Sequence, residues 1–383
     1  MFLNKFFAHT YTETNSDVAV TCSTECNRWL VNPAIDLLLC CGGLTWLLVA
    51  AHLILNKFDQ TANAAIMLTA CIAPLIHGFS EPHIAATLTR LFGNSDTRRR
   101  FSFHSIVLPL LGCFLVAAGL FVKGFVGGLL KLYLIWLTQH FAAQSYGLVL
   151  LYCYKNQYTL TKFDKRLMNT LLNSAALLVV VRQLGNPDYA INDFLGQRMP
   201  HWGTMSALLE PFCTIVLQAM VALFVGRCLA RYCISGKCLP LPALMIITTS
   251  ITMFVAGYEL FGVFWMYAPA FFHAAQYLVL TLAGHLKRCA DLDVTKEKAS
   301  LLSENVALER GLRYYAILLL ISVGIFVILP ALLHLLGFSY QLAFANVFCV
   351  VSLHHFASDA AIWKFRDPRL QNEFKLPSNA VRN

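Results

Sequence analysis

Charged residues are scarce in this sequence. Only 13% of its 383 residues are charged, 58% are hydrophobic, and the mean hydropathy is +0.61. A soluble domain carries about 25% charged residues, so the composition excludes an ordinary soluble protein. The first 33 residues lack a short apolar core behind a basic start. We therefore expect no cleaved signal peptide, and insertion through the first membrane-spanning helix.

A basic surface suited to nucleic acid is also missing. The formal net charge is +9, but Lys and Arg are not interleaved with aromatic residues in any one patch. Basic residues instead flank apolar runs, as they do on the cytoplasmic side of membrane proteins. We expect membrane lipids as partners and no nucleic acid.

The thirteen cysteines include no CxxC pair, and most lie singly inside apolar runs, where they serve as small hydrophobic residues. Two groups differ. Cys22 and Cys26 lie near the N-terminus, and Cys228, Cys233 and Cys238 are evenly spaced between two apolar runs. Their spacing leaves two interpretations open, a zinc site and lipid attachment.

Long apolar runs dominate the chain, and a membrane span needs about 20 such residues. The fold class predicted is an all-α polytopic membrane bundle. It has a tail at 1–33, a bundle at 34–363 and a second tail at 364–383. We predict ten spans, at 34–55, 62–89, 105–122, 126–152, 167–183, 205–226, 241–263, 267–286, 312–336 and 340–363.

The distribution of basic residues predicts how these spans are oriented. With the N-terminus inside, 24 of the 29 Lys and Arg residues lie on the inner side and 5 on the outer side. An excess of Lys and Arg marks cytoplasmic segments. We therefore expect a multi-pass protein of the bacterial inner (cell) membrane, with both termini in the cytoplasm.

Ionisable residues inside four of the spans are the most unusual feature, because such groups are costly in a membrane and mark functional sites. At 1.5 Å per residue from the inner basic flank, they lie about 8 to 22 Å deep. The predicted metal ligands are His77, His83, His140, His273, His354, His355 and Asp359. The predicted supporting polar residues are Glu81, Gln144 and Gln276.

Spacing places several of these residues on shared helix faces. His140 and Gln144 are four residues apart, as are His355 and Asp359, and such pairs are neighbours on a helix surface. An imidazole with an amide or carboxylate one turn away is a typical arrangement for a metal ligand. His354 and His355 are about 100° apart around the helix, and Asp359 favours His355 as the ligand.

Imidazoles with a carboxylate suit iron, zinc, copper or manganese, and open positions suit non-haem iron chemistry. The pairs His77–Gly78, His140–Phe141 and His354–His355 resemble motifs of His-rich membrane non-haem iron enzymes, namely desaturases, hydroxylases and the bacterial carotene-cleaving type. The HxxxH and HxxHH boxes of desaturases are absent. The ending HHFASDAAIWKFRDP is similar to that of uncharacterised bacterial membrane proteins.

The resemblance implies a non-haem iron oxidoreductase. The position of the imidazoles in the membrane interior predicts a lipophilic small molecule as substrate, and their depth in the inner half predicts a cytoplasmic electron donor. Three alternatives remain open. Two facing histidines could ligate haem b for electron transfer. Histidines and carboxylates in spans also form the relays of proton-coupled transporters. Finally, the histidines could simply hydrogen-bond between helices.

Overall fold

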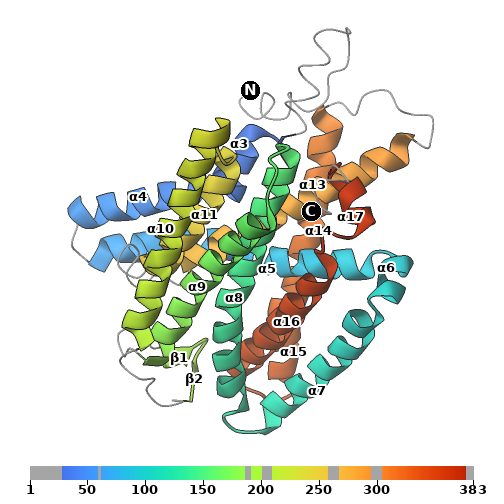
Figure 1. Ribbon diagram of the computed structural model, residues 1–383. Coiled ribbons are helices and arrows are strands. Elements are labelled where there is room, and N and C mark those ends of the chain that lie inside the picture. Colours follow the sequence, from blue (N-terminus) through green and yellow to red (C-terminus); the bar gives the residue numbers. More distant parts are fainter. Residues whose placement is uncertain are drawn as a thin grey trace.

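The structure is a computed structural model that describes residues 28–58, 62–185, 191–200, 209–257, 267–294 and 304–376. The described chain is almost entirely helical (Figure 1). Its N-terminal half contains α3 (Pro33–Ile35), η1 (Asp36–Cys40), α4 (Gly43–Phe58), α5 (Ala62–Phe92), α6 (Ser95–Arg100), η2 (Phe103–Val107), α7 (Leu108–Phe121), α8 (Phe125–Lys155) and α9 (Lys162–Gly185).

The C-terminal half continues the same pattern. Its helices are α10 (Leu209–Ser235), α11 (Leu241–Val255), α13 (Tyr267–Val294), α14 (Glu304–Val323), η5 (Gly324–Ile328), α15 (Leu329–Leu335), α16 (Tyr340–Ile362) and α17 (Pro368–Glu373). Within the described ranges, β-structure is limited to a small antiparallel hairpin of β1 (Asp193–Phe194) and β2 (Gln197–Arg198).

Several helices are long and apolar enough to cross a membrane. They are Phe103–Phe121, Lys162–Gly185, Leu209–Ser235 and Val306–Leu335, and a fifth span results if the bent pair Pro33–Cys40 and Gly43–Ile54 is counted as one. This supports a helical membrane protein. The ten crossings, the side on which the termini lie and the location in an inner membrane stay predictions.

The break in the first predicted span has a local cause at Gly42. Its φ of +90° is open to glycine and strained for other residues, and the helices on either side of it are bent by 53°. A Cβ at Gly42 would lie 2.7 Å from the Thr249 side chain. Close approach of α11 and positive φ therefore both require glycine here.

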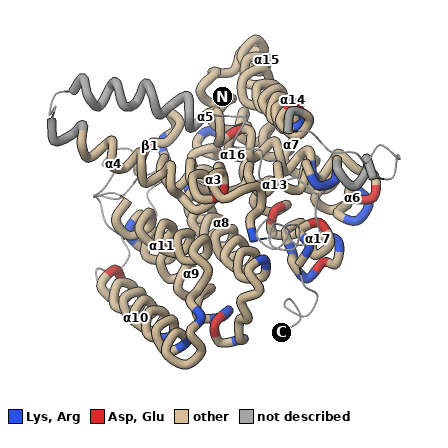
Figure 2. Tube along the Cα trace, turned by 90° about the horizontal axis from the view of Figure 1, so that it is seen from above, with Lys and Arg blue, Asp and Glu red and all other residues tan. Residues whose placement is uncertain are grey.

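The helices do not all run in one direction. In Figure 1, α4 and α5 run roughly from side to side, whereas α8, α9 and α10 run roughly from top to bottom. Lys and Arg gather mainly at helix ends and in short segments such as α6 and α17, as Figure 2 shows. The bodies of the central helices carry few charges, which is the arrangement expected where their surroundings are apolar.

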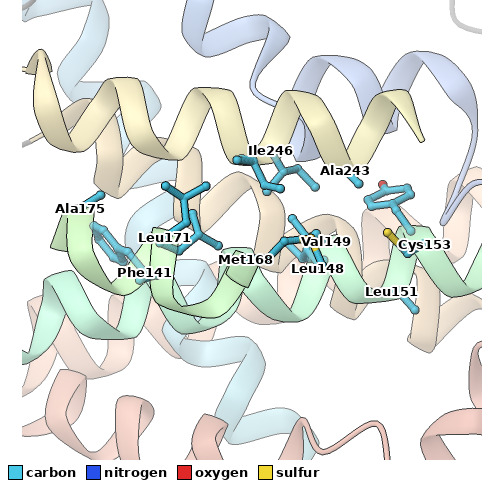
Figure 3. Packing of buried hydrophobic residues seen from close by; sticks show 14 of the residues in the cluster. Phe141, Leu148, Val149, Leu151, Cys153, Met168, Leu171, Ala175, Ala243 and Ile246 are labelled. Carbon is cyan, nitrogen blue, oxygen red and sulfur yellow. The ribbon is translucent and has the colours of Figure 1, made fainter. Parts of the chain in front are cut away.

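The main hydrophobic core lies between α8, α9 and α11. Figure 3 shows Leu148 and Val149 of α8 against Met168 and Leu171 of α9, with Ile246 of α11 above them. A second cluster joins α8 to α16 around Leu134 and Phe356. Because α8 belongs to both clusters, its position is fixed from two sides.

Four helices form a closed ring of neighbours beside this core. α5 packs against α13 and α16, and α8 packs against the same two helices. These are the helices that carry the predicted histidines. Within the described residues, none of the four is among the candidate spans, and each carries at least one buried histidine.

Candidate metal centre

Four histidine side chains meet inside this ring of helices, one from each helix. His83 lies on α5, His273 on α13, His140 on α8 and His355 on α16. Ring centroids are 5.1 Å apart for His83–His273, 4.7 Å for His273–His140, 5.0 Å for His140–His355 and 4.8 Å for His355–His83. The order of the imidazoles therefore repeats the order of the helices.

The cluster is sealed from solvent. All four side chains are buried, and His355 has no exposed surface. Nitrogen atoms that face no hydrogen-bond partner include Nε2 of His140, both ring nitrogens of His273 and Nε2 of His355. Buried polar atoms are normally paired, so several unpaired ones in one place require an explanation. A metal ion would satisfy them.

Two overlapping sets of side chains have the spacing of a metal site. In one set the ligand atoms of His83, His273 and His355 lie within 4.8 Å of one another. The other set consists of His140, His355 and Asp359. His355 belongs to both sets, so the five side chains surround one region of the bundle.

Asp359 is connected to His355 through hydroxyl groups. Its Oδ1 atom accepts hydrogen bonds from Thr87 (2.8 Å) and Tyr277 (2.7 Å). The Thr87 oxygen is also 2.7 Å from Nδ1 of His355. Because the Thr87 hydroxyl donates its hydrogen bond to the carboxylate, its oxygen must accept from His355. Nδ1 of His355 therefore carries the hydrogen and is the donor toward Thr87. Nε2 of His355 then keeps its lone pair and is free to bind a metal.

The amides predicted to support the site lie on the other side of His273. Nε2 of Gln144 donates to the carbonyl of His273 (2.9 Å) and to Oε1 of Gln276 (3.1 Å). Gln276 donates in turn to the carbonyl of Cys40 (3.1 Å). These bonds tie α8, α13 and η1 together, so both amides hold the helix backbone behind the cluster.

Aromatic rings cover two of the imidazoles. Phe356 stacks on His140 with a centroid distance of 4.3 Å, and Phe141 stacks on His273 at 4.4 Å. Each phenylalanine directly follows one cluster histidine in the sequence and stacks on a cluster histidine of a different helix. Such packing restricts the imidazole rings to one orientation and keeps water away from them.

Three of the predicted residues do not join the cluster, namely His77, Glu81 and His354. His77 has a largely exposed side chain, and its Nδ1 is 2.7 Å from Glu81 Oε1. Its position six residues before His83 puts it about 9 Å further along α5. His354 turns toward η2, where Nε2 meets the His104 carbonyl at 2.8 Å. As expected from Asp359, His355 rather than His354 faces the site.

The cysteine groups receive no support as metal sites from the described part of the chain. Cys228 is partly buried, and Cys233 and Cys238 are exposed and free. They form no metal-like group with one another there. Cys22 and Cys26 lie outside the described residues, as does most of the predicted N-terminal tail.

Thr87, Tyr277 and Trp363 belong to the site although they were not predicted. The indole nitrogen of Trp363 donates to the Tyr277 hydroxyl (3.0 Å). A sequence signal for two of them exists, because Thr87 follows His83 by four residues and Tyr277 follows His273 by four. Every cluster histidine thus has a polar residue one turn later, on the same helix face.

Comparison of the chain with protein family models, with curated proteins and with solved structures finds no match. The geometry of the site therefore carries the functional argument.

Proposed function

We propose that this protein is an integral membrane, metal-dependent oxidoreductase of the hydroxylase, desaturase or oxygenase type, acting on a lipophilic substrate. The observation that carries the proposal is the meeting of four buried imidazoles from four helices, with nitrogens that have no protein partner. Packing alone does not explain this, because a desolvated nitrogen without a hydrogen bond is costly.

The chemistry of the ligand set supports iron as the metal. Imidazole nitrogens bind iron, copper and zinc, and an added carboxylate oxygen favours iron or manganese over copper. His83, His140, His273 and His355 would supply the nitrogens and Asp359 the oxygen. A bound iron ion would supply one-electron and dioxygen chemistry at otherwise unreactive C–H or C=C bonds.

The spacing of the rings favours a bare ion over haem b. The ring centroids of His273 and His355, which face each other across the ring of helices, are 6.2 Å apart. His83 and His140 each lie about 5 Å from both of them. They occupy the space between the pair, where the flat macrocycle of a haem would have to lie.

The protein's own groups would perform three tasks. The hydroxyls of Thr87 and Tyr277 hold the carboxylate, Phe141 and Phe356 exclude water, and Gln144 fixes the backbone of α13. A lipophilic substrate suits a site inside an apolar helix bundle. We place the electron donor on the cytoplasmic side, since the predicted inner flank lies nearest to Asp359.

The decisive experiment is metal analysis of protein purified in detergent, by inductively coupled plasma mass spectrometry. We expect about one equivalent of iron in the wild-type protein and a loss of most of it in His140→Ala and His273→Ala. The chain offers two matched controls: His77→Ala and His354→Ala also remove a histidine, but from outside the cluster, and should keep the metal.

Other results would redirect the proposal. A protein that binds no metal, even after anaerobic incubation with Fe²⁺, Mn²⁺ and Zn²⁺, would overturn it and favour a proton-coupled transporter. A Soret absorption band would establish haem instead. Oxidoreductase activity itself is tested by comparing lipid extracts of a bacterial host that produces the wild-type protein or His140→Ala. We expect a lipid whose mass differs by one oxygen atom or by two hydrogen atoms only in the host that produces the wild-type protein.

A further inference from the structure

Two buried hydroxyl groups, those of Thr87 and Tyr277, meet at Asp359 beside the candidate metal centre, and the Thr87 hydroxyl also contacts His355. They come from α5 and α13, while the histidine and the carboxylate come from α16. Thr87 has no exposed surface and Tyr277 almost none. Three separate helices therefore meet at one set of hydrogen bonds directly beside the cluster.

We propose that Thr87 and Tyr277 are positioning residues that aim Asp359 at the cluster as an oxygen ligand, and that they thereby determine which metal the site prefers. The inference rests on the proposed metal centre and adds to it a basis for metal selectivity. With Asp359 in place the site offers four nitrogens and one oxygen. Without it, the site offers imidazoles alone.

The hydrogen bonds leave one carboxylate oxygen available. Oδ1 of Asp359 accepts from both hydroxyls, at 2.8 Å from Thr87 and 2.7 Å from Tyr277. Oδ2 lies 3.7 Å from Nε2 of His355, and Asp359 forms one of the metal-like sets together with His140 and His355. Oδ1 is thus fixed by the protein, and Oδ2 is left to face the metal.

The Thr87 hydroxyl also acts on His355. Because Thr87 accepts from Nδ1 of His355 (2.7 Å) while donating to Asp359, one threonine sets both the tautomer of the imidazole and the direction of the carboxylate. Trp363 keeps the Tyr277 hydroxyl in place through its indole N–H (3.0 Å). The Arg90 guanidinium, 4.0 Å above the Trp363 ring, completes the support.

Ligand chemistry gives this arrangement a consequence for selectivity. Carboxylate oxygens are preferred by Mn²⁺ and Fe²⁺, whereas imidazoles alone suffice for Zn²⁺ and Cu²⁺. Removing the hydroxyls should let the Asp359 side chain turn away from the cluster, although no ligand side chain is removed. We therefore expect Mn²⁺ binding to weaken much more than Zn²⁺ binding. Loss of such supporting hydrogen bonds typically weakens metal binding about 10- to 100-fold.

The experiment compares Tyr277→Phe, Thr87→Val and Thr87→Ser with the wild-type protein. The first two substitutions remove a hydroxyl and keep the shape of the side chain, and Thr87→Ser restores the hydroxyl. Ser358→Ala is the matched control, because Ser358 is also a buried hydroxyl on α16 but its oxygen has no hydrogen-bond partner. Mn²⁺ and Zn²⁺ affinities are measured on metal-free protein by equilibrium dialysis, with the electron paramagnetic resonance spectrum of bound Mn²⁺ as a second readout.

We expect Tyr277→Phe and Thr87→Val to lose at least about tenfold in Mn²⁺ affinity relative to Zn²⁺ affinity, and the Mn²⁺ spectrum to change. Thr87→Ser and Ser358→Ala should retain the wild-type ratio. Equal losses for both metals, or none, would overturn the inference while leaving the metal centre intact. A wild-type protein that binds neither metal would overturn the metal centre as well. Should Thr87→Val fail to fold, Tyr277→Phe decides the outcome alone.

Discussion

At the scale of single residues, polar side chains inside an apolar chain fall into two kinds. Some are fully satisfied and stabilise the fold. Asp36 is an example: its carboxylate accepts from the backbone N–H groups of Leu30 (2.6 Å) and Val31 (3.1 Å) and from the Tyr152 hydroxyl (2.7 Å). Others, such as His273, have nitrogens without partners. Several residues of the second kind gathered in one place point to a ligand, and residues of the first kind do not.

This distinction predicts different effects of substitution at the two sites. Tyr152→Phe removes one buried hydrogen bond to Asp36, so we expect the free energy of unfolding to fall by about 1 kcal/mol. Asp36→Ala leaves three donors without an acceptor and should cost about 3 kcal/mol or more. The midpoint of thermal unfolding in detergent measures both. Neither variant should alter metal content, and a loss of metal in Tyr152→Phe would contradict the separation of the two sites.

Residue spacing in the sequence predicted part of the candidate site. His140, His273, His355 and Asp359 were predicted together because each pairs with a polar residue one helical turn away. His77 was grouped with them by the same rule, through Glu81. The rule identifies a shared helix face but not which face points inward, and α5 turns His77 to the exterior while His83 points into the ring. Only the packing of the four helices decides this.

At the scale of the elements, the sequence predicted helices better than it predicted their bends. Each of the ten predicted apolar segments coincides with helix over most of its described residues, and parts of the segments 205–226 and 241–263 lie outside the described residues. The break at Gly42, however, places its backbone so close to Thr249, about two hundred residues later, that only glycine fits there. Long-range contacts of this kind leave no periodic signal in a sequence.

The bend at Gly42 gives a second prediction. Gly42→Ala forces a side chain into positive φ and against Thr249, so we expect a loss of about 1 to 3 kcal/mol in the free energy of unfolding. Thr249→Ala in the same chain relieves the clash but not the backbone strain, and it should restore only part of the stability. The measurement is thermal unfolding of the two single variants and the double variant. Full restoration would show that the clash alone requires glycine.

The short helix α17 connects the C-terminal segment to the helices of the site. Glu373 forms ion pairs with Arg90 of α5 (2.7 Å) and with Arg288 of α13. Arg90 in turn lies over the Trp363 ring. The conformation of α17 is therefore linked to the C-terminal parts of α5 and α13, the two helices that carry His83 and His273.

We expect Glu373→Gln to loosen this attachment. The amide lacks the charge that two guanidinium groups share, so the C-terminal segment should be cleaved faster by trypsin at Arg369 or Lys375. Limited proteolysis of the variant in detergent, followed by mass spectrometry, measures the rate. Glu309→Gln is a suitable control, because its ion pair with Arg313 is exposed and lies within α14, and exposed pairs contribute little. Equal cleavage rates in both variants would contradict the attachment.

At the scale of the whole molecule, charge and structure give complementary information about the membrane. The excess of Lys and Arg on one side predicts both cytoplasmic termini. The structure adds that helices suited to crossing include the peripheral η2–α7, α10 and α14–η5–α15, whose apolar windows are mostly not buried by the protein. The polar ring of α5, α8, α13 and α16 is enclosed next to them. Apolar helices outside and polar helices inside are the arrangement that a low-dielectric surrounding requires.

The predicted orientation is tested with native and introduced cysteines. Cys233 and Cys238 are exposed and follow the sixth predicted span, on the inner side. Arg198 is exposed in the hairpin before that span, on the outer side. In intact cells, a membrane-impermeant maleimide should label Arg198→Cys in a chain whose other cysteines are replaced by serine. It should label Cys233 and Cys238 only after the cells are opened. Labelling of both positions from the same side would mean that α10 does not cross the membrane, and the alternation of ten spans would fail at that helix.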